Sequence, residues 1–279
     1  MESSIALVCT APEREPEAAA LADGFGLRRE DHPPTHGDRL ALVLTANRLE
    51  LRAAGRAAPG PLAVDFTAGR QYHRGRRASI RDEALARAAG IGRGWRPEVI
   101  DATAGLGRDS FLLASMGCSV TACERNPVVA ALLADGLARA KSAAATRDIA
   151  RRIHLRHCDA LAVLAERASD VILVDPMHPP RRKSAAVKKE MRLLQQLVGA
   201  DPDSTALLAA ALGAARHRVV VKRPARAEPL PGPAPFHTVS GRSTRFDVYA
   251  GHAEGDAGGG SANPDDRPQG GTQTRRPRR

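Results

Sequence analysis

The sequence predicts an α/β fold in which helices cover both faces of a mostly parallel sheet. Two observations predict it. Between about residue 81 and residue 250, short apolar segments alternate with segments of helical periodicity. The apolar segments are continuous runs of Val, Ile and Leu, as expected for strands that are buried on both faces. The length of 279 residues and the hydrophobic fraction of 43% are sufficient for a real core.

Local signals place the elements of residues 81–250 in order. Gly90 and Gly117 each follow an expected helix, Pro127 begins one, and Asp203 or Ser204 caps another. The expected order is helix 81–89, strand 98–102, helix 109–116, strand 119–123, helix 127–139, strand 153–156, helix 160–166, strand 171–174, helices 185–197 and 204–215, and strands 218–221 and 246–250.

Residues 1–80 are expected to form a small N-terminal α+β extension that is a possible RNA-contact region. Short segments rich in branched side chains predict strands at 5–9, 40–44 and 62–66. The stretch 50–56, between the last two, is polar and basic.

The C-terminal residues 251–279 are rich in Gly, Asp, Pro and Arg and have no periodicity, which predicts a disordered tail. The Arg-rich end of this tail either contacts RNA or remains solvated. The whole chain has a net charge of +11 and a pI near 10.4, which favours a polyanionic partner. Because only 5 of the 42 basic residues are Lys, a GC-rich genome is an alternative source of this charge.

Several classes of protein are disfavoured. The stretch 5–9 lacks a basic leader, and no apolar run approaches the roughly 18 residues of a membrane span, so we expect a cytoplasmic protein. Four cysteines without a C-x-x-C pair predict neither a disulfide framework nor a zinc site, and no metal is expected. The 3% aromatic content disfavours a module that binds single strands by stacking. The sequence contains no G-x-S-x-G or H-E-x-x-H motif.

A glycine loop follows the strand at 98–102. Asp101 lies near the end of this strand, and Gly105 and Gly107 precede the next helix. A dinucleotide site would require G-x-G-x-x-G, but the third position is Ser110. Asp101 and Asp109 flank the loop and would repel a diphosphate. They suit a cationic ligand such as S-adenosylmethionine (AdoMet), which carries a sulfonium and an α-ammonium group.

The same loop has groups for the other end of AdoMet. Glycines allow the backbone to approach the methionine moiety closely. The N-terminal amides of the following helix, together with Arg108, can hold its carboxylate.

Two further acids follow strands of the same sheet. Glu124 comes 23 residues after Asp101, close to the roughly 20 residues expected for an acid that binds ribose hydroxyls. An exposed Glu in a turn is the alternative. Asp159, preceded by Cys158, either accepts the exocyclic amine of adenine or caps the helix at 160–166, and the two roles are compatible.

The segment D-P-M-H-P at 175–179 ends a fully apolar strand. It resembles the D/N-P-P-Y/F/W loop of methyltransferases that act on exocyclic amines of bases. The amine is a poor nucleophile, so Asp175 and a rigid carbonyl at Pro176 would accept its N–H bonds and orient it. His178 occupies the position that stacks on the target base. A simple Pro-rich turn is the alternative.

Basic residues flank this loop in the sequence. Lys188, Lys189 and Arg192 lie on the expected helix 185–197, where they would meet phosphates around an extruded guanine or form a solvated face. Arg74 belongs to a second basic cluster at 69–77, which is either an RNA-contact loop or a hinge.

Taken together, these blocks resemble the RsmJ family of bacterial 16S ribosomal RNA guanine-N2 methyltransferases, over roughly residues 38–251. The matching blocks are DATAGLGRD (101–109), CERNPVVAALLADGLAR (123–139), DPMHP (175–179), SAAVKKEMRLLQQLVG (184–199), VVVKRP (219–224), RFDVYAG (245–251) and, upstream, LALVLTANRLELR (40–52) with 64–74. His178 stands where the family commonly has Phe, and Cys158-Asp159 stands where small polar residues occur.

The resemblance implies a class I AdoMet-dependent methyltransferase fold, Rossmann-like, with a seven-stranded, mostly parallel sheet. It also implies N2-methylguanosine as the product and 16S rRNA or the 30S subunit as the partner. By position, it implies AdoMet contacts at Arg108-Asp109, Glu124-Arg125, Cys158-Asp159 and Asp175.

Three hypotheses follow. The first is methyl transfer from AdoMet to guanine N2 in 16S rRNA, with Asp175 orienting the amine. The second keeps the fold but has adenine N6 or a protein amine as acceptor. The third is a basic RNA-binding protein without catalysis. A nicotinamide oxidoreductase is disfavoured by the missing third glycine.

Overall fold

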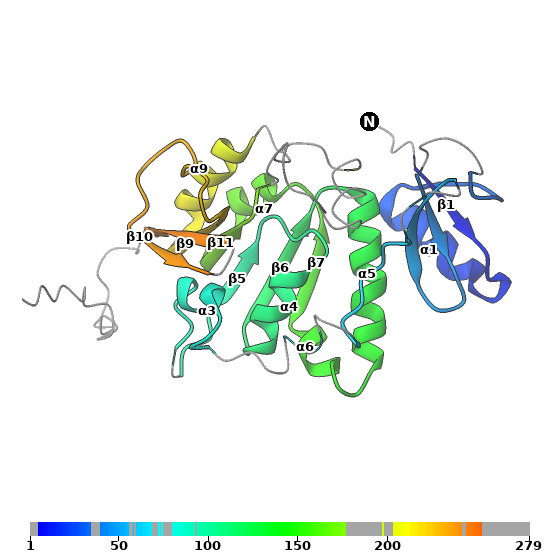
Figure 1. The fold of residues 1–279 in the computed structure, drawn as a ribbon, viewed down its shortest axis with the longest axis horizontal. Coiled ribbons are helices and arrows are strands. Elements are labelled where there is room, and N and C mark those ends of the chain that lie inside the picture. Colours follow the sequence, from blue (N-terminus) through cyan, green and yellow to red (C-terminus); the bar gives the residue numbers. More distant parts are fainter. Residues whose placement is uncertain are drawn as a thin grey trace, which may run out of the picture.

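The computed structural model describes residues 5–34, 40–55, 58, 60–68, 72, 74, 80–92, 94–176, 197, 203–241 and 244–252. These residues form two sheets (Figure 1). One has four strands in the order β2-β1-β3-β4, and the other has seven strands in the order β10-β11-β9-β8-β5-β6-β7.

The larger sheet confirms the predicted seven-stranded, mostly parallel architecture. Its five strands β7, β6, β5, β8 and β9 are parallel, and β11 pairs antiparallel with β9 and with β10. The strands are β5 (Glu98–Asp101), β6 (Ser119–Glu124), β7 (Ile153–His157), β8 (Ser169–Val174), β9 (Ala215–Pro224), β10 (His237–Ser240) and β11 (Thr244–Ala250).

Helices cover both faces of this sheet. Neighbouring residues of one strand, such as Val99 and Ile100, belong to different buried clusters, which explains why the central strands carry continuous apolar runs. Leu112 of α4 and Leu132 of α5 pack in the first cluster, and Leu208 of α9 packs in the second. The helices are α3 (Ala84–Ala88), α4 (Arg108–Ser115), α5 (Pro127–Ser142), α6 (Arg147–Arg151), α7 (Ala160–Glu166) and α9 (Ser204–Ala214).

The order of the strands determines where a ligand can bind. From β5 the chain continues to β6 and β7 on one side, and it then returns to β8 on the other side of β5. In open α/β sheets, ligands bind beyond the carboxyl ends of the strands at such a reversal. We therefore expect the ligand-binding site at the carboxyl ends of β5, β6 and β8.

The smaller sheet is built from residues of the N-terminal zone. β1 lies parallel to β2 and β3, and β3 forms an antiparallel pair with β4. Its elements are β1 (Ala6–Cys9), η1 (Pro12–Arg14), α1 (Glu15–Phe25), β2 (Arg28–Arg29), β3 (Leu40–Leu44) and β4 (Leu49–Ala53).

The predicted strand at 62–66 is wrong, because Leu62 makes only an isolated bridge to Leu51. The partner of β3 is instead β4, in the stretch that looked polar. Leu49 and Leu51 are fully buried, and Glu50 is accommodated between them because it pairs with Arg48 and Arg52. The strand was missed because polar and apolar residues alternate in it and its charged residues made the stretch look like a polar loop. In the structure, Glu50 forms ion pairs with Arg48 and Arg52.

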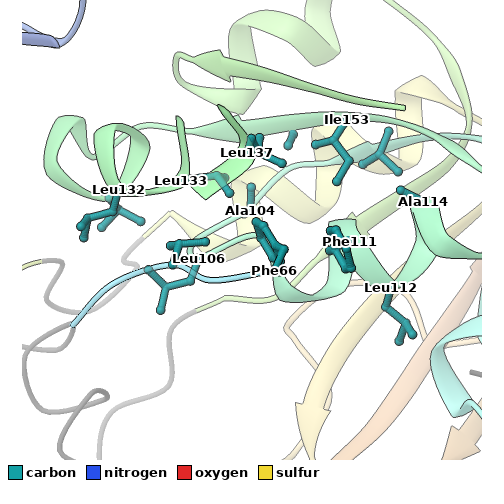
Figure 2. Close-up of a cluster of buried hydrophobic side chains, with 14 of the residues drawn as sticks. Phe66, Ala104, Leu106, Phe111, Leu112, Ala114, Leu132, Leu133, Leu137 and Ile153 are labelled. Atoms are coloured by element: carbon teal, nitrogen blue, oxygen red, sulfur yellow. The ribbon is translucent and has the colours of Figure 1, made fainter. Parts of the chain in front are cut away.

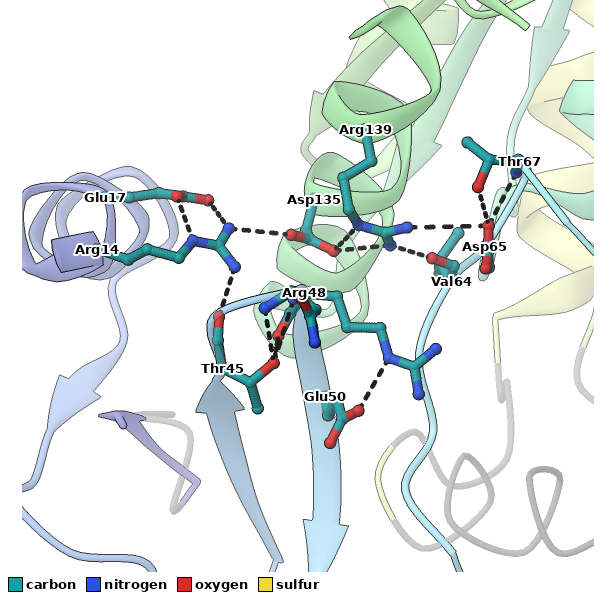
Figure 3. Close-up of polar contacts among 11 residues, drawn as sticks. Arg14, Glu17, Thr45, Arg48, Glu50, Val64, Asp65, Thr67, Asp135 and Arg139 are labelled. Carbon is teal, nitrogen blue, oxygen red and sulfur yellow. Dashed lines mark hydrogen bonds and ion pairs between the residues drawn. The ribbon is translucent and has the colours of Figure 1, made fainter. Parts of the chain in front are cut away.

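Figure 3 shows how the N-terminal zone meets α5. Arg14 lies 3.6 Å from Asp135, and Arg139 contacts Asp135 at 2.8 Å and donates a hydrogen bond to the Val64 carbonyl. Gly136, between them on the helix, allows the chain at Val64 to approach closely. Helix α5 also contacts β4 on one side and β6 and β7 on the other (Figure 1). The two sheets therefore share one helix.

The core beneath the glycine loop contains an aromatic pair (Figure 2). Phe66 stacks on Phe111 of α4 with 4.4 Å between ring centroids and an interplanar angle of 6°. Phe66 is therefore part of the core, although it does not belong to a strand. It packs in the same buried cluster as Leu106 and Leu133.

Other boundaries differ from prediction. Helix α3 begins at Ala84 rather than 81, and β9 extends from Ala215, where the helix was expected to end. The elements η1, α1, β2, α6 and β10 were not predicted. Of the expected helix 185–197, only Leu197 is described, and the expected tail lies outside the described residues from 253 onward. No helix in the described ranges has the length and apolarity to cross a membrane.

Candidate functional site

A pocket lies at the carboxyl ends of β5, β6, β7 and β8. It brings together most of the residues that the sequence predicted for a cofactor. Of the predicted residues that the structure describes, Asp101, Gly107, Arg108 and Asp109 lie outside its lining. The lining consists of Ala102, Thr103, Gly105, Cys123, Glu124, Arg125, Val129, Cys158, Asp159, Ala160, Asp175, Pro176, Asp203, Ser204 and Leu207.

Glu124 is held in place by backbone groups. Its carboxylate accepts the N–H of Gly105 at 2.9 Å and the N–H of Asn126 at 2.7 Å. Gly105 has a φ of 54°, in the left-handed region that glycine adopts without strain. The glycine loop and the acid at the end of β6 are therefore one unit, with the buried carboxylate at the pocket wall.

Gly107 has a different role from Gly105. It precedes α4 with a φ of 70°, and a Cβ at this position would lie 2.5 Å from Leu133 and 3.3 Å from Phe66. This glycine therefore allows the loop to pack on the core shown in Figure 2. Arg108 and Asp109 begin α4 immediately after it.

Asp101 lies beneath the loop and is 2% exposed. It accepts hydrogen bonds from the Ser110 hydroxyl at 2.5 Å and from the Thr103 N–H at 3.2 Å. Its pKa is raised to about 7, first because the carboxyl group is buried and also because Asp109 and Asp175 carry like charge. Ser110, which breaks the dinucleotide pattern, thus supplies a hydroxyl to the acid that ends β5.

Asp175 follows β8 and is fixed at two points. Its N–H donates to the Thr103 hydroxyl at 2.6 Å, and its Oδ2 accepts a bond from Lys222 Nζ at 2.7 Å. Pro176 is buried beside it. His178 lies outside the described residues, so its predicted stacking role stays a prediction.

Lys222 was not predicted as a site residue. It lies in β9 and bonds Asp109 Oδ2 as well as Asp175 Oδ2, both at 2.7 Å. Burial would lower the pKa of this lysine, but the two carboxylates outweigh burial and raise it above its ordinary range. The available signal was a lysine directly after the apolar residues 219–221, close to the end of a strand that was expected to be buried.

The far wall of the pocket comes from β7 and α7. Asp159 accepts the Leu161 N–H at 2.9 Å, so it caps α7, and it also lines the pocket. Cys158 beside it lies close to Cys123, and burial raises the pKa of the Cys123 thiol, with Cys158 adding to the rise. The predicted cap is confirmed.

Arg125 and Asp203 meet across the pocket. Arg125 Nη1 lies 2.7 Å from Asp203 Oδ2. Asp203 was predicted only as a possible cap of the next helix. It does stand at the N-cap of α9, but its carboxylate bonds Arg125 and makes no capping bond to the helix within the described residues.

The predicted RNA-contact residues are only partly described. Arg74 lies 2.7 Å from Glu83 and 4.0 Å from Asp109, and its pKa is raised chiefly by the hydrogen bond to Glu83. It therefore borders the carboxylates behind the glycine loop. Lys188, Lys189 and Arg192 lie outside the described residues.

The chemistry of the pocket fits AdoMet. Carboxylates of Glu124, Asp159 and Asp175 make it attractive to a cation, and Val129, Leu207 and neighbouring apolar groups can hold an adenine ring. Among the described residues, no group of three or more His, Cys, Asp or Glu side chains could hold a metal ion.

Comparison with known proteins gives consistent results. Residues 13–251 match a family model described as "Putative SAM-dependent methyltransferase". The chain is 54% identical to ribosomal RNA small subunit methyltransferase J of Thioalkalivibrio sulfidiphilus over 76% of this chain and 85% of that protein. It is 47% identical to the protein of the same name from Coxiella burnetii over 89% of this chain and 98% of that one.

A solved structure is also similar. A SAM-dependent methyltransferase from Neisseria gonorrhoeae superimposes with a TM-score of 0.71 at 36% identity. The match covers 90% of this chain and 97% of that one, so it includes the N-terminal zone as well as the larger sheet.

Proposed function

The chain belongs to the methyltransferase J family of AdoMet-dependent enzymes, and from this premise we propose that it methylates the exocyclic N2 of a guanine in 16S ribosomal RNA. The products are N2-methylguanosine and S-adenosylhomocysteine. The observation that carries the proposal is the position of Asp175-Pro176, at the end of β8 and on the wall of the pocket.

The AdoMet contacts considered first come from three strand ends, those of β5, β6 and β7. Glu124 would accept the two ribose hydroxyls, because a carboxylate can accept two hydrogen bonds at once. Asp159 would accept the exocyclic amine of adenine, with Cys158 beside the ring. The loop at Gly105 would lie against the methionine moiety. When bound there, AdoMet supplies an electrophilic methyl group.

Asp175 would then orient the nucleophile. The lone pair of an exocyclic amine is delocalised into the base, so the amine must be held with its nitrogen directed at the methyl carbon. The Asp175 carboxylate and the Pro176 carbonyl would accept its two N–H bonds and stabilise the positive charge that develops on nitrogen. Proton loss from that nitrogen completes the reaction.

The same proposal assigns roles to the remaining zones. Residues 1–80 form an RNA-contact extension, residues 81–250 the methyltransferase core, and residues 251–279 a tail. Arg74, Lys188, Lys189 and Arg192 contact RNA phosphates, and His178 stacks on the target base. Arg74 is exposed and lies beside Asp109 at the start of α4, so it is accessible at the edge of the site, which supports its part of this proposal. An RNA substrate of this kind places the enzyme in the cytoplasm.

The experiment uses 30S subunits from a strain that lacks this gene, the purified full chain and methyl-labelled AdoMet. Digestion and mass analysis of nucleosides should give label in N2-methylguanosine of the 16S RNA. Asp175→Asn should lower kcat by about 100-fold or more, because it removes the charge at the developing cation. Asp148→Asn, at an exposed position of α6, is the matched control and should keep wild-type turnover. Label in N6-methyladenosine or in ribosomal protein would overturn the guanine substrate.

A further inference from the structure

Lys222 occupies a position between two acids of the site that come from different elements. Its ammonium group bonds Asp109 at the start of α4 and Asp175 after β8, each at 2.7 Å. The Lys222 side chain is only 25% exposed, so the two bonds are largely shielded from water. Lys222 therefore links Asp109, which follows the glycine loop, to Asp175, which is proposed to orient the amine.

The charges around Lys222 are mostly negative. Asp101 lies behind Asp109 and Asp175 and is influenced electrostatically by both. Arg74 contributes a second cation 4.0 Å from Asp109, but it forms a closer pair with Glu83 at 2.7 Å. Arg223 is influenced by Asp175 from the neighbouring position of β9. Lys222 bonds Asp175 directly.

Lys222 holds the side chain of Asp175. The backbone at Asp175 is bonded to the Thr103 hydroxyl, but that bond leaves the side-chain torsions undetermined. The bond from Lys222 to Oδ2 holds the carboxylate itself. A catalytic group that is displaced by about 1 Å can lose roughly 100-fold in rate, so the orientation of this carboxylate matters.

We propose that Lys222 is a positioning residue for methyl transfer, which holds the Asp175 carboxylate ionised and in one orientation toward the incoming amine. The proposal rests on the proposed function in assigning the amine-orienting role to Asp175. Lys222 acts through Asp175 and need not touch either substrate. If the ion pair were purely structural, losing Lys222 would lower the stability of the fold but would not change the pH at which turnover is lost. A positioning role predicts that this pH does change, so the two roles can be distinguished by measurement.

The test compares Lys222→Met, which keeps the length but removes the charge, with Lys222→Arg, which keeps the charge. Lys222→Met should lower kcat by about 10- to 100-fold. It should also move the acid limb of the kcat–pH profile upward by about one pH unit or more, because loss of the opposite charge raises the pKa of Asp175. Lys222→Arg should keep the acid limb of the wild type. Lys141→Met, on the exposed last turn of α5, should match the wild type.

A second readout does not require turnover. Without Lys222, the cluster of carboxylates repels itself once ionised, so the Tm difference between Lys222→Met and the wild type should grow as pH rises from about 5 to 8. Calorimetry with S-adenosylhomocysteine should show a smaller change in Kd than in kcat, since Lys222 lies outside the pocket lining. An equal loss in kcat for Lys222→Met at every pH, with no movement of the acid limb, would overturn the proposal.

The two proposals can fail separately. The comparison of variants uses whichever nucleoside the wild type methylates, so label in a different nucleoside overturns only the guanine substrate. If Lys222→Met does not fold, Lys222→Arg decides the matter. An acid limb in Lys222→Arg that lies about one pH unit or more above that of the wild type would contradict a role based on charge.

Discussion

Arg125 and Asp203 form an ion pair, with 2.7 Å between Nη1 and Oδ2, that joins the end of β6 to the start of α9. Both residues line the pocket. The two side chains are 40% and 34% exposed, so the pair is partly screened by water. Because water screens the pair, its loss should change the free energy of unfolding little. Because both residues line the pocket, its loss should change ligand affinity more.

Asp203→Ala should weaken the binding of S-adenosylhomocysteine by about three- to fivefold, because a pair of this exposure contributes up to about 1 kcal/mol. Isothermal titration calorimetry measures the change. Asp148→Ala removes a comparable acid from the exposed 4.0 Å pair with Arg151 and serves as the control. Equal affinities for wild type and Asp203→Ala would show that the pair does not shape the pocket.

Glu124→Gln should reduce affinity for S-adenosylhomocysteine by about 10- to 100-fold. The amide can still accept one backbone N–H, so the loop at Gly105 should stay folded, but the charged acceptor for the ribose hydroxyls is lost. Calorimetry gives the Kd, and circular dichroism checks that the fold is kept. An unchanged Kd would remove Glu124 from the proposed ribose site.

Gly136→Ala should lower the free energy of unfolding by roughly 1–3 kcal/mol. A Cβ at this position would lie 2.7 Å from Val64 Cβ and 3.1 Å from the Val64 carbonyl, where α5 meets the N-terminal zone. Gly213→Ala in α9 is the control, since nothing lies within 4 Å of its Cβ position and alanine favours a helix. Urea denaturation should separate the two variants in opposite directions.

Asp101 should make stability depend on pH. Its pKa is raised to about 7 in the folded protein, from about 3.9 in the unfolded chain, so folding favours the protonated form. The stabilisation is complete below about pH 4 and is lost as pH rises toward 7. Asp101→Asn should abolish this decline, as measured by urea denaturation at several pH values. Identical pH dependence in both proteins would show that Asp101 is ionised throughout.

The sequence was most informative where a pattern was local. Strands β5 and β8 were recognisable because their central residues, Val99-Ile100 and Val171–Val174, are apolar and buried on both faces of the sheet. A functional acid or loop stands at the end of each strand. Helix α5 was predicted from its N-terminal Pro127, since proline at that position is compatible with a helix.

The failures arose where long-range contacts outweighed local composition. Strand β4 contains Glu50, whose charge is balanced by flanking arginines, and it is stabilised by pairing with β3. Phe66 looked like part of a strand because of its apolar neighbours, but its place is determined by stacking on Phe111. Neither partner can be identified from the residues next to it in the chain.

The sequence by itself determined the fold class, the family and the acids at the strand ends. Each of these appears as a local pattern: buried strands as apolar runs, the family as short motif blocks, and the acids as residues at or directly after a strand. Only the tertiary structure decided which acids line the pocket and which support it. Glu124 lies on the pocket wall, whereas Asp101 lies beneath the loop. It also brought Lys222 to Asp175, across 47 positions of the chain. Such pairings depend on the order and register of the strands in the sheet, and these cannot be read from the number of residues between two positions.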